Sequence, residues 1–129
     1  MILDTSALSA IFFAEPEGDV YIRMIHGADR CRMSAANFVE LSMLIEGQLG
    51  PEALRQCDMF LRRAAIVIEP VTLEHAHLAR QGFLDFGKGR HPAGLNFGDC
   101  FAYALAKAAD EPLLYKGKDF SQTDIKSAG

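Results

Sequence analysis

Four very short apolar segments are spread along this 129-residue chain, and longer segments with helical periodicity lie between them. This alternation favours a parallel sheet with helices on both faces over a sheet built from hairpins. We therefore expect an α/β protein of three layers, in which helices sandwich a short parallel sheet of about four to five strands. Residues 1–129 are expected to form one domain. The expected strands are Ile2–Leu3, Cys31–Met33, Ile66–Ile68 and Leu113–Tyr115.

The expected helices follow from apolar spacing and from residues that begin or end helices. Pro16 suits a first helical turn, Gly50 and Pro51 separate two helices, and Asn96 can cap the last one. The expected helices begin at Thr5, run from about 16 to 27, span Ala35–Leu49, Pro51–Ala65 and Leu73–Phe86, and follow Asn96.

The segment Ala35–Leu49 carries apolar residues almost all the way round its helix, whereas a surface helix shows a single apolar stripe. We expect it to be buried on two sides, against the sheet and against a partner. Glu40 is the exception within this helix. Because an unpaired buried charge is costly, Glu40 requires either a cation, such as an arginine, or hydrogen-bond donors nearby.

Composition narrows the function classes. Half of the residues are hydrophobic, which is enough for the core of one domain, and the net charge is -4. That charge argues against nucleic-acid binding through broad electrostatics, but it allows a local basic patch. The three cysteines have no metal-binding or disulfide-framework spacing. The longest apolar run, Phe101 to Ala106, is too short to cross a membrane, so we expect a cytoplasmic protein.

Acidic residues recur where the expected strands end and the next helices begin. Asp4 and Asp119 follow strands, Asp99 opens a helix, and Glu40 lies one turn into another. Each alone is explained as a helix cap or as a favourable charge near a helix start. In a parallel sheet, however, all four would crowd at one edge, where like charges repel unless a cation joins them. An all-oxygen site of this kind favours Mg²⁺ or Mn²⁺, which can promote phosphodiester hydrolysis.

Other residues are candidates for supporting roles around this edge. Thr5, Ser6 and Thr123 could orient water or phosphate, and Asp124 could contact a metal through water. The segment Gly87–Gly94 has three glycines and a proline, so we expect a loop. Its basic residues, together with the lysine before Asp119, are candidates for binding a phosphate backbone, and they are Lys88, Arg90, His91 and Lys118.

The segments MILDTSAL, NFVEL, FGDCFAYALA and LLYKGKDFSQTDI together resemble a PIN domain, specifically a VapC-type toxin of a toxin–antitoxin pair. The resemblance covers nearly the whole chain. It implies a metal-dependent endoribonuclease with an acidic quartet at Asp4, Glu40, Asp99 and Asp119. It also implies a homodimer and a cognate antitoxin whose segment covers the cleft. One departure is Gly117-Lys118-Asp119, where the family often has asparagine at the middle position.

Two other enzyme classes lack residues that they require. A phosphoryl-accepting signalling domain needs an acid pair after the first strand, but Asp4 is followed by Thr5 and Ser6. A haloacid-type phosphatase needs a second aspartate two positions after the first, where this chain has Ser6. A PIN-fold module that binds RNA or an antitoxin without cutting RNA stays open as the alternative.

Overall fold

The computed structural model covers residues 1–129, and its four strands form one parallel sheet in the order β3-β2-β1-β4. The predicted α/β architecture is confirmed, with four strands. The second and third strands each begin one residue later than predicted, at Arg32 and Val67, because these two residues are the first that pair with each other. Cys31 lies outside the pairing, although its carbonyl accepts a hydrogen bond from the Val67 amide. The strands are β1 (Ile2–Leu3), β2 (Arg32–Ser34), β3 (Val67–Glu69) and β4 (Leu113–Leu114).

Six α-helices and one short 3-10 helix make up the rest of the regular structure. Asn96 caps α6 as predicted, and its side chain accepts a hydrogen bond from the Asp99 amide. The helix after Pro51 ends two residues earlier than predicted, just before Ala65 takes a left-handed backbone conformation. The helices are α1 (Thr5–Phe12), α2 (Gly18–Gly27), α3 (Ala35–Leu49), α4 (Pro51–Arg63), α5 (Leu73–Phe86), α6 (Phe97–Ala109) and η1 (Phe120–Gln122).

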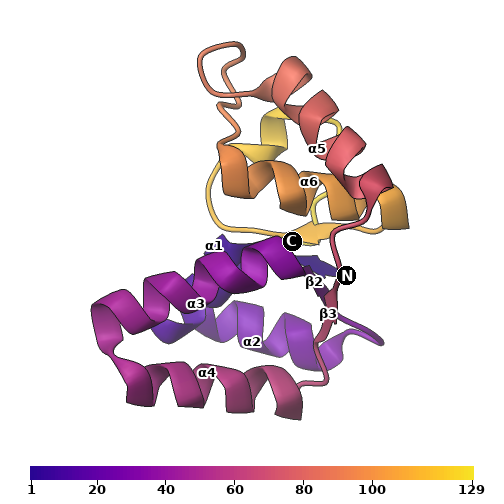
Figure 1. The fold of residues 1–129 in the computed structure, drawn as a ribbon. Coiled ribbons are helices and arrows are strands. Elements are labelled where there is room, and N and C mark those ends of the chain that lie inside the picture. Colours follow the sequence, from indigo (N-terminus) through magenta and orange to yellow (C-terminus); the bar gives the residue numbers. More distant parts are fainter.

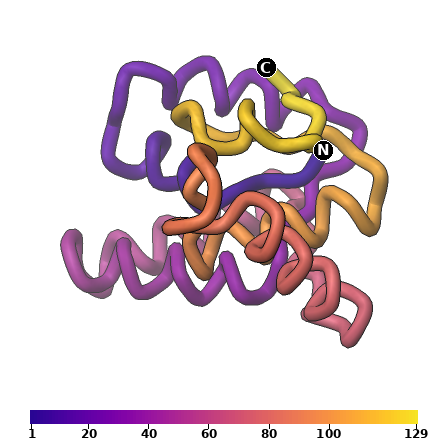
Figure 2. The backbone as a smooth tube through the Cα atoms, turned by 90° about the horizontal axis from the view of Figure 1, so that it is seen from above, coloured from indigo at the N-terminus to yellow at the C-terminus, as the bar shows by residue number.

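Helices cover both faces of the sheet. Figure 1 shows α5 and α6 on one side of the strands and α1 to α4 on the other. Side chains alternate between the two layers: Leu3 and Leu114 belong to the core beneath α1 to α4, whereas Ile2 and Leu113 belong to the core beneath α5 and α6. The two chain ends lie near each other, as Figure 2 shows from above. No helix combines the length and the apolar character needed to cross a membrane.

Helix α3 has only one fully buried side in this chain. Asn37, Leu41 and Ile45 are buried, but Val39 and Met43 are 52% and 71% exposed. Apolar side chains exposed to this extent on a helix are typical of an interaction surface. The predicted partner on this side of α3 therefore stays a prediction.

Candidate active site

Asp4 lies where β1 ends and α1 begins, and it is only 3% exposed. Its Oδ2 caps α1 by accepting hydrogen bonds from the Ser6 amide at 3.0 Å and the Ser6 hydroxyl at 2.5 Å. The Lys116 amide donates to the Ser6 hydroxyl at 3.0 Å, so Ser6 links Asp4 to the segment after β4. The other carboxylate oxygen of Asp4, Oδ1, is buried and has no hydrogen-bond partner. Asp4 therefore acts as a helix cap and still keeps one oxygen available for a ligand.

The carboxyl groups at this edge disfavour one another's ionisation. Burial raises the pKa of Asp4 to about 7, and the nearby charges of Asp99 and Glu40 also raise it. Burial likewise raises the pKa of Asp99, and the charges of Asp119 and Glu40 contribute. Asp4, Glu40 and Asp99 therefore lie within electrostatic range of one another, and Asp119 lies within range of Asp99. Such perturbed acids in a cleft are typical of functional sites.

Glu40 points from α3 toward the start of α6. Its Oε1 accepts a hydrogen bond from the Thr5 hydroxyl at 2.5 Å and a longer one from the side-chain Nδ2 of Asn37 at 3.4 Å. The sequence left two arrangements open for Glu40, an arginine partner or hydrogen-bond donors. The structure shows hydrogen-bond donors. Its other oxygen packs against the Cα atom of Gly98, where any side chain would collide with the carboxylate.

Asp99 lies in the first turn of α6. Its Oδ2 accepts a hydrogen bond from the Asn96 amide at 3.0 Å, while the Asn96 side chain accepts one from the Asp99 amide. This capping box fixes the direction of the Asp99 side chain. Asp119 lies farther out, on an exposed turn just before η1.

Three of the four acids line one open cleft of about 500 Å³. As the side chains stand, no three of them form a ready-made ligand set for a metal ion. The donor chemistry nevertheless fits a hard divalent cation, because carboxylate and hydroxyl oxygens surround the cleft and Asp4 Oδ1 lacks a partner. No cationic side chain lines the cleft. The lining residues are Asp4, Thr5, Ser6, Ser9, Glu40, Met43, Leu44 and Asp99.

The remaining predicted residues lie outside this cleft. The Thr123 hydroxyl donates to the Phe120 carbonyl at 2.7 Å, and the Asp124 carboxylate pairs with Lys107 at 2.8 Å. Lys118 is exposed beside Asp119. In the basic loop, His91 accepts a hydrogen bond from the Ala93 amide, so its side chain supports the loop's own structure.

The same loop carries two exposed cations. Lys88 lines a pocket between α5 and α6, and the Arg90 guanidinium lies 5.2 Å from the centre of the Phe83 ring.

Sequence reasoning missed two residues that build the site. Asn37 is fully buried and donates from its side chain to the Gly98 carbonyl at 2.9 Å, which ties α3 to α6 beside Glu40 and Asp99. Gly98 is the position at which the two helices approach closely enough for this bond. The only signal in the sequence was the spacing: Asn37 lies one helical turn before Glu40, and Gly98 directly precedes Asp99.

The model of the PIN-domain family matches residues 1–126 of the chain. Ribonuclease VapC28 of Mycobacterium tuberculosis is 46% identical over 129 residues, which cover 99% of this chain and 97% of that protein. Ribonuclease VapC of Mycolicibacterium smegmatis is 42% identical over 125 residues, or 97% of each chain. The crystal structure of M. tuberculosis VapC20, described as a sarcin-ricin loop cleaving toxin, superposes with a TM-score of 0.77 at 17% identity and covers 96% of this chain and 95% of that one. Given a family match over almost its full length and relatives of this similarity, the chain belongs to the PIN-domain family, with VapC ribonucleases among its relatives.

Proposed function

We propose that residues 1–129 form one nuclease domain that hydrolyses RNA phosphodiester bonds with the help of a divalent metal ion. The observation that carries this proposal is the grouping of Asp4, Glu40 and Asp99 around one cleft that contains no cationic side chain. The VapC relatives are named ribonucleases, which supports RNA as the substrate. We further propose that the chain is a toxin neutralised by a cognate antitoxin.

Asp4 and Asp99 are the proposed main ligands of Mg²⁺ or Mn²⁺. Glu40 would bind directly or through water, and Asp119 would complete the rim. When bound, the metal would polarise the phosphate and favour ionisation of a water molecule. The Ser6 hydroxyl holds Asp4 through Oδ2 and leaves Oδ1 free, while the Thr5 hydroxyl and Asn37 hold Glu40. Thr123 and Asp124 bond elsewhere, so we leave them out of the residues that would support the site.

We propose that exposed cations outside the cleft hold the RNA backbone. Lys88, Arg90 and Lys118 are exposed and form no ion pair with a carboxylate. A phosphate backbone is the ligand that such unpaired cations favour.

Helix α3 offers a surface for the proposed protein partners. Met43 and Leu44 line the cleft, and the exposed Val39 lies one turn before Met43. An apolar segment of an antitoxin that lay on these side chains would also cover the acids. We further propose that two copies of the chain associate as a homodimer.

The test is cleavage of a structured RNA pool by the purified protein with Mg²⁺, with Mn²⁺ or with EDTA, beside an Asp99→Asn variant. We expect cuts that require metal and that the variant fails to make. Calorimetric titration with Mn²⁺ gives a second readout, in which the Asp4→Asn, Asp99→Asn double variant should lose binding. Full metal-dependent cleavage by that double variant would contradict the proposal.

A PIN-fold module that binds RNA or an antitoxin without cutting is the alternative. It is disfavoured because the chain keeps all four acids, which such a module would not need. RNA binding with no cleavage under any metal condition would favour it.

A further inference from the structure

A second hollow opens beside the acidic cleft, between α5 and α6, with a volume of about 500 Å³. We call it the α5–α6 pocket. Its walls are apolar and include three phenylalanines, Phe83, Phe97 and Phe101, while Arg80 and Lys88 line it as well. A volume in this range is typical of pockets that bind small organic groups.

Phe97 is the most exposed large apolar side chain of the protein, at 81%. It contacts Phe101 edge to face, with ring centres 4.9 Å apart. This contact leaves most of the surface of the Phe97 ring open. An exposed, oriented aromatic ring is the feature on which proteins stack unpaired nucleic-acid bases.

The charge around the pocket points to an anionic partner. Arg80 and Lys88 line the pocket, Arg90 lies over the ring of the lining residue Phe83, and none of the three forms an ion pair with a carboxylate. No carboxylate lines the pocket. In a chain of net charge -4, this combination of free cations and open aromatic rings suits a nucleotide, which has an apolar ring next to a phosphate.

The pocket and the acids share the first turn of α6. Asn96, Phe97 and Cys100 line the pocket, and Asp99 lies among them in sequence while its side chain turns into the acidic cleft. Phe97 also borders a smaller hollow that Glu40 lines. A base in the pocket would therefore keep its own backbone within reach of the carboxylates.

We propose that the α5–α6 pocket binds one unstacked base of a single-stranded RNA substrate, with Phe97 as the stacking platform and Arg80 and Lys88 as contacts to the adjoining phosphates. The inference rests on the proposed ribonuclease function and adds where a base beside the cut is held. A second copy of the chain is the competing occupant. The free cations favour RNA, because the exposed α3 surface of another copy offers apolar side chains but no matching run of acids.

The test measures binding of a fluorescein-labelled, unstructured oligoribonucleotide in EDTA, by anisotropy, with an Asp99→Asn background that prevents cutting. We expect Phe97→Ser to weaken binding about 5- to 100-fold, as loss of one stacked base does, and Phe97→Trp to restore it. Leu73→Ser is the matched control, since Leu73 is 75% exposed on α5 and does not line the pocket. A series of oligonucleotides, each with one abasic position at a different place in the strand, adds a second readout. The protein with Phe97 intact should bind one member of the series more weakly than the unmodified strand, whereas Phe97→Ser should bind every member as well as the unmodified strand.

Sedimentation velocity on the same samples separates the outcomes. If Phe97→Ser dissociates an oligomer and leaves the RNA affinity unchanged, the pocket is a protein interface and the proposal is wrong. Unchanged affinity and unchanged oligomeric state would overturn it as well, while wild-type RNA cleavage would still uphold the nuclease. Conversely, binding that depends on Phe97 in a protein that never cuts RNA would support the pocket and refute the proposed catalysis.

Discussion

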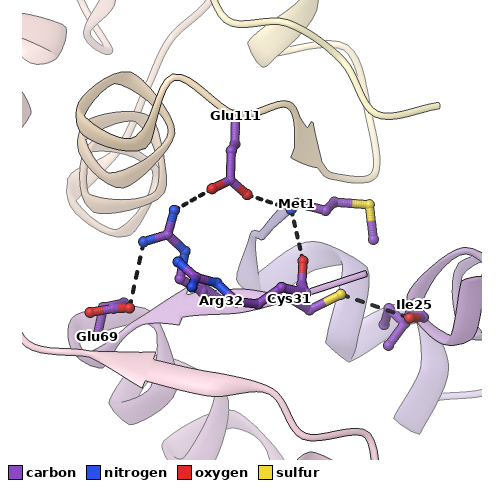
Figure 3. Close-up of polar contacts among 7 residues, drawn as sticks. Met1, Ile25, Cys31, Arg32, Glu69 and Glu111 are labelled. Carbon is purple, nitrogen blue, oxygen red and sulfur yellow. Dashed lines mark hydrogen bonds and ion pairs between the residues drawn. The ribbon is translucent and has the colours of Figure 1, made fainter. Parts of the chain in front are cut away.

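The charged residues at the two ends of the parallel strands differ in how they are neutralised. We call the side where the strands end the carboxyl edge of the sheet, and the opposite side the amino edge. Where β1, β2 and β4 begin, the ammonium of Met1 and the guanidinium of Arg32 both contact Glu111 (Figure 3). Arg32 also lies 3.6 Å from Glu69, the last residue of β3. Where β1 and β4 end, Asp4, Glu40 and Asp99 share a cleft with no cation. Both groups are at least partly buried, yet only the first contains its own counter-charges.

The direction of the pKa shifts follows this difference. The hydrogen bond from the Met1 ammonium, aided by Arg32, lowers the pKa of Glu111, whereas burial and like charges raise the pKa of Asp4 and Asp99. The unpaired carboxylates of Asp4 and Asp99 therefore lower the stability of the folded protein. We infer that the carboxyl edge holds its acids at a cost to stability because a ligand supplies the missing charge.

Asp4→Asn is expected to have the largest effect and should move activity and stability in opposite directions. Cleavage should fall about 1000-fold or more, since the proposed metal loses a main ligand. In EDTA at pH 8, the free energy of unfolding should rise by on the order of 2–4 kcal/mol, because the variant no longer buries a charged carboxylate. Urea unfolding at several pH values measures the second effect.

The sign of the pH dependence follows from the raised pKa. Between the ordinary value of 3.8 and about 7, the folded protein keeps a proton on Asp4 that the unfolded chain releases. Wild-type stability in EDTA should therefore fall as the pH rises through this window, and Asp4→Asn should lack that part of the slope. Asp124→Asn serves as the control, since Asp124 is paired with Lys107 and its removal should lower stability. A less stable Asp4→Asn protein at pH 8 would refute the cost that we assign to this edge.

The alternation of strands and helices was sufficient to predict the parallel sheet, its layers and the edge at which Asp4 emerges. Apolar spacing reports directly on which segments are buried, and a parallel sheet aligns its strand ends. The strand limits shifted by one residue because pairing register depends on a neighbouring strand, as with Arg32 and Val67. A single sequence does not contain that information.

The supporting contacts of the site could not be predicted in the same way. The bond from Asn37 to the Gly98 carbonyl joins two helices far apart in sequence, and it forms only because the two backbones approach closely there. The partners of Thr123 and Asp124 are likewise set by the path of the chain after β4. The residues next to Thr123 and Asp124 in the sequence suggested that both lie beside the acids, but those neighbours do not determine the path of the chain.

Gly98→Ala tests how tightly the carboxyl edge is built, with an intermediate expected effect. The added methyl group would collide with the Glu40 carboxylate, which Thr5 and Asn37 hold in place. We expect Glu40 to swing away, so that cleavage falls about 10- to 100-fold, as for loss of a supporting contact. The midpoint of thermal unfolding should change little, because a flexible carboxylate moves rather than a backbone. Gly47→Ala on α3, where a methyl group meets nothing within 4 Å, is the matched control. Equal activity in both variants would argue against a fixed position for Glu40.

Glu111→Gln addresses the compensated edge, where the smallest effect is expected. Removing the charge weakens two charge-assisted hydrogen bonds, from the Met1 ammonium and from Arg32, and should cost about 1–2 kcal/mol at pH 7. Because the pKa of Glu111 is lowered on folding, its contribution is present above the ordinary value of 4.5 and disappears as the pH falls below it. Wild type and variant should therefore converge in stability as the pH falls below 4.5, opposite to the dependence expected for Asp4. Glu52→Gln, which breaks an exposed pair with Arg55, should leave the unfolding midpoint unchanged. If Glu111→Gln left the unfolding midpoint unchanged, as expected for Glu52→Gln, the ion pairs around Arg32 would add nothing to the stability of the fold. The difference between the two edges would then come from the unpaired carboxylates alone.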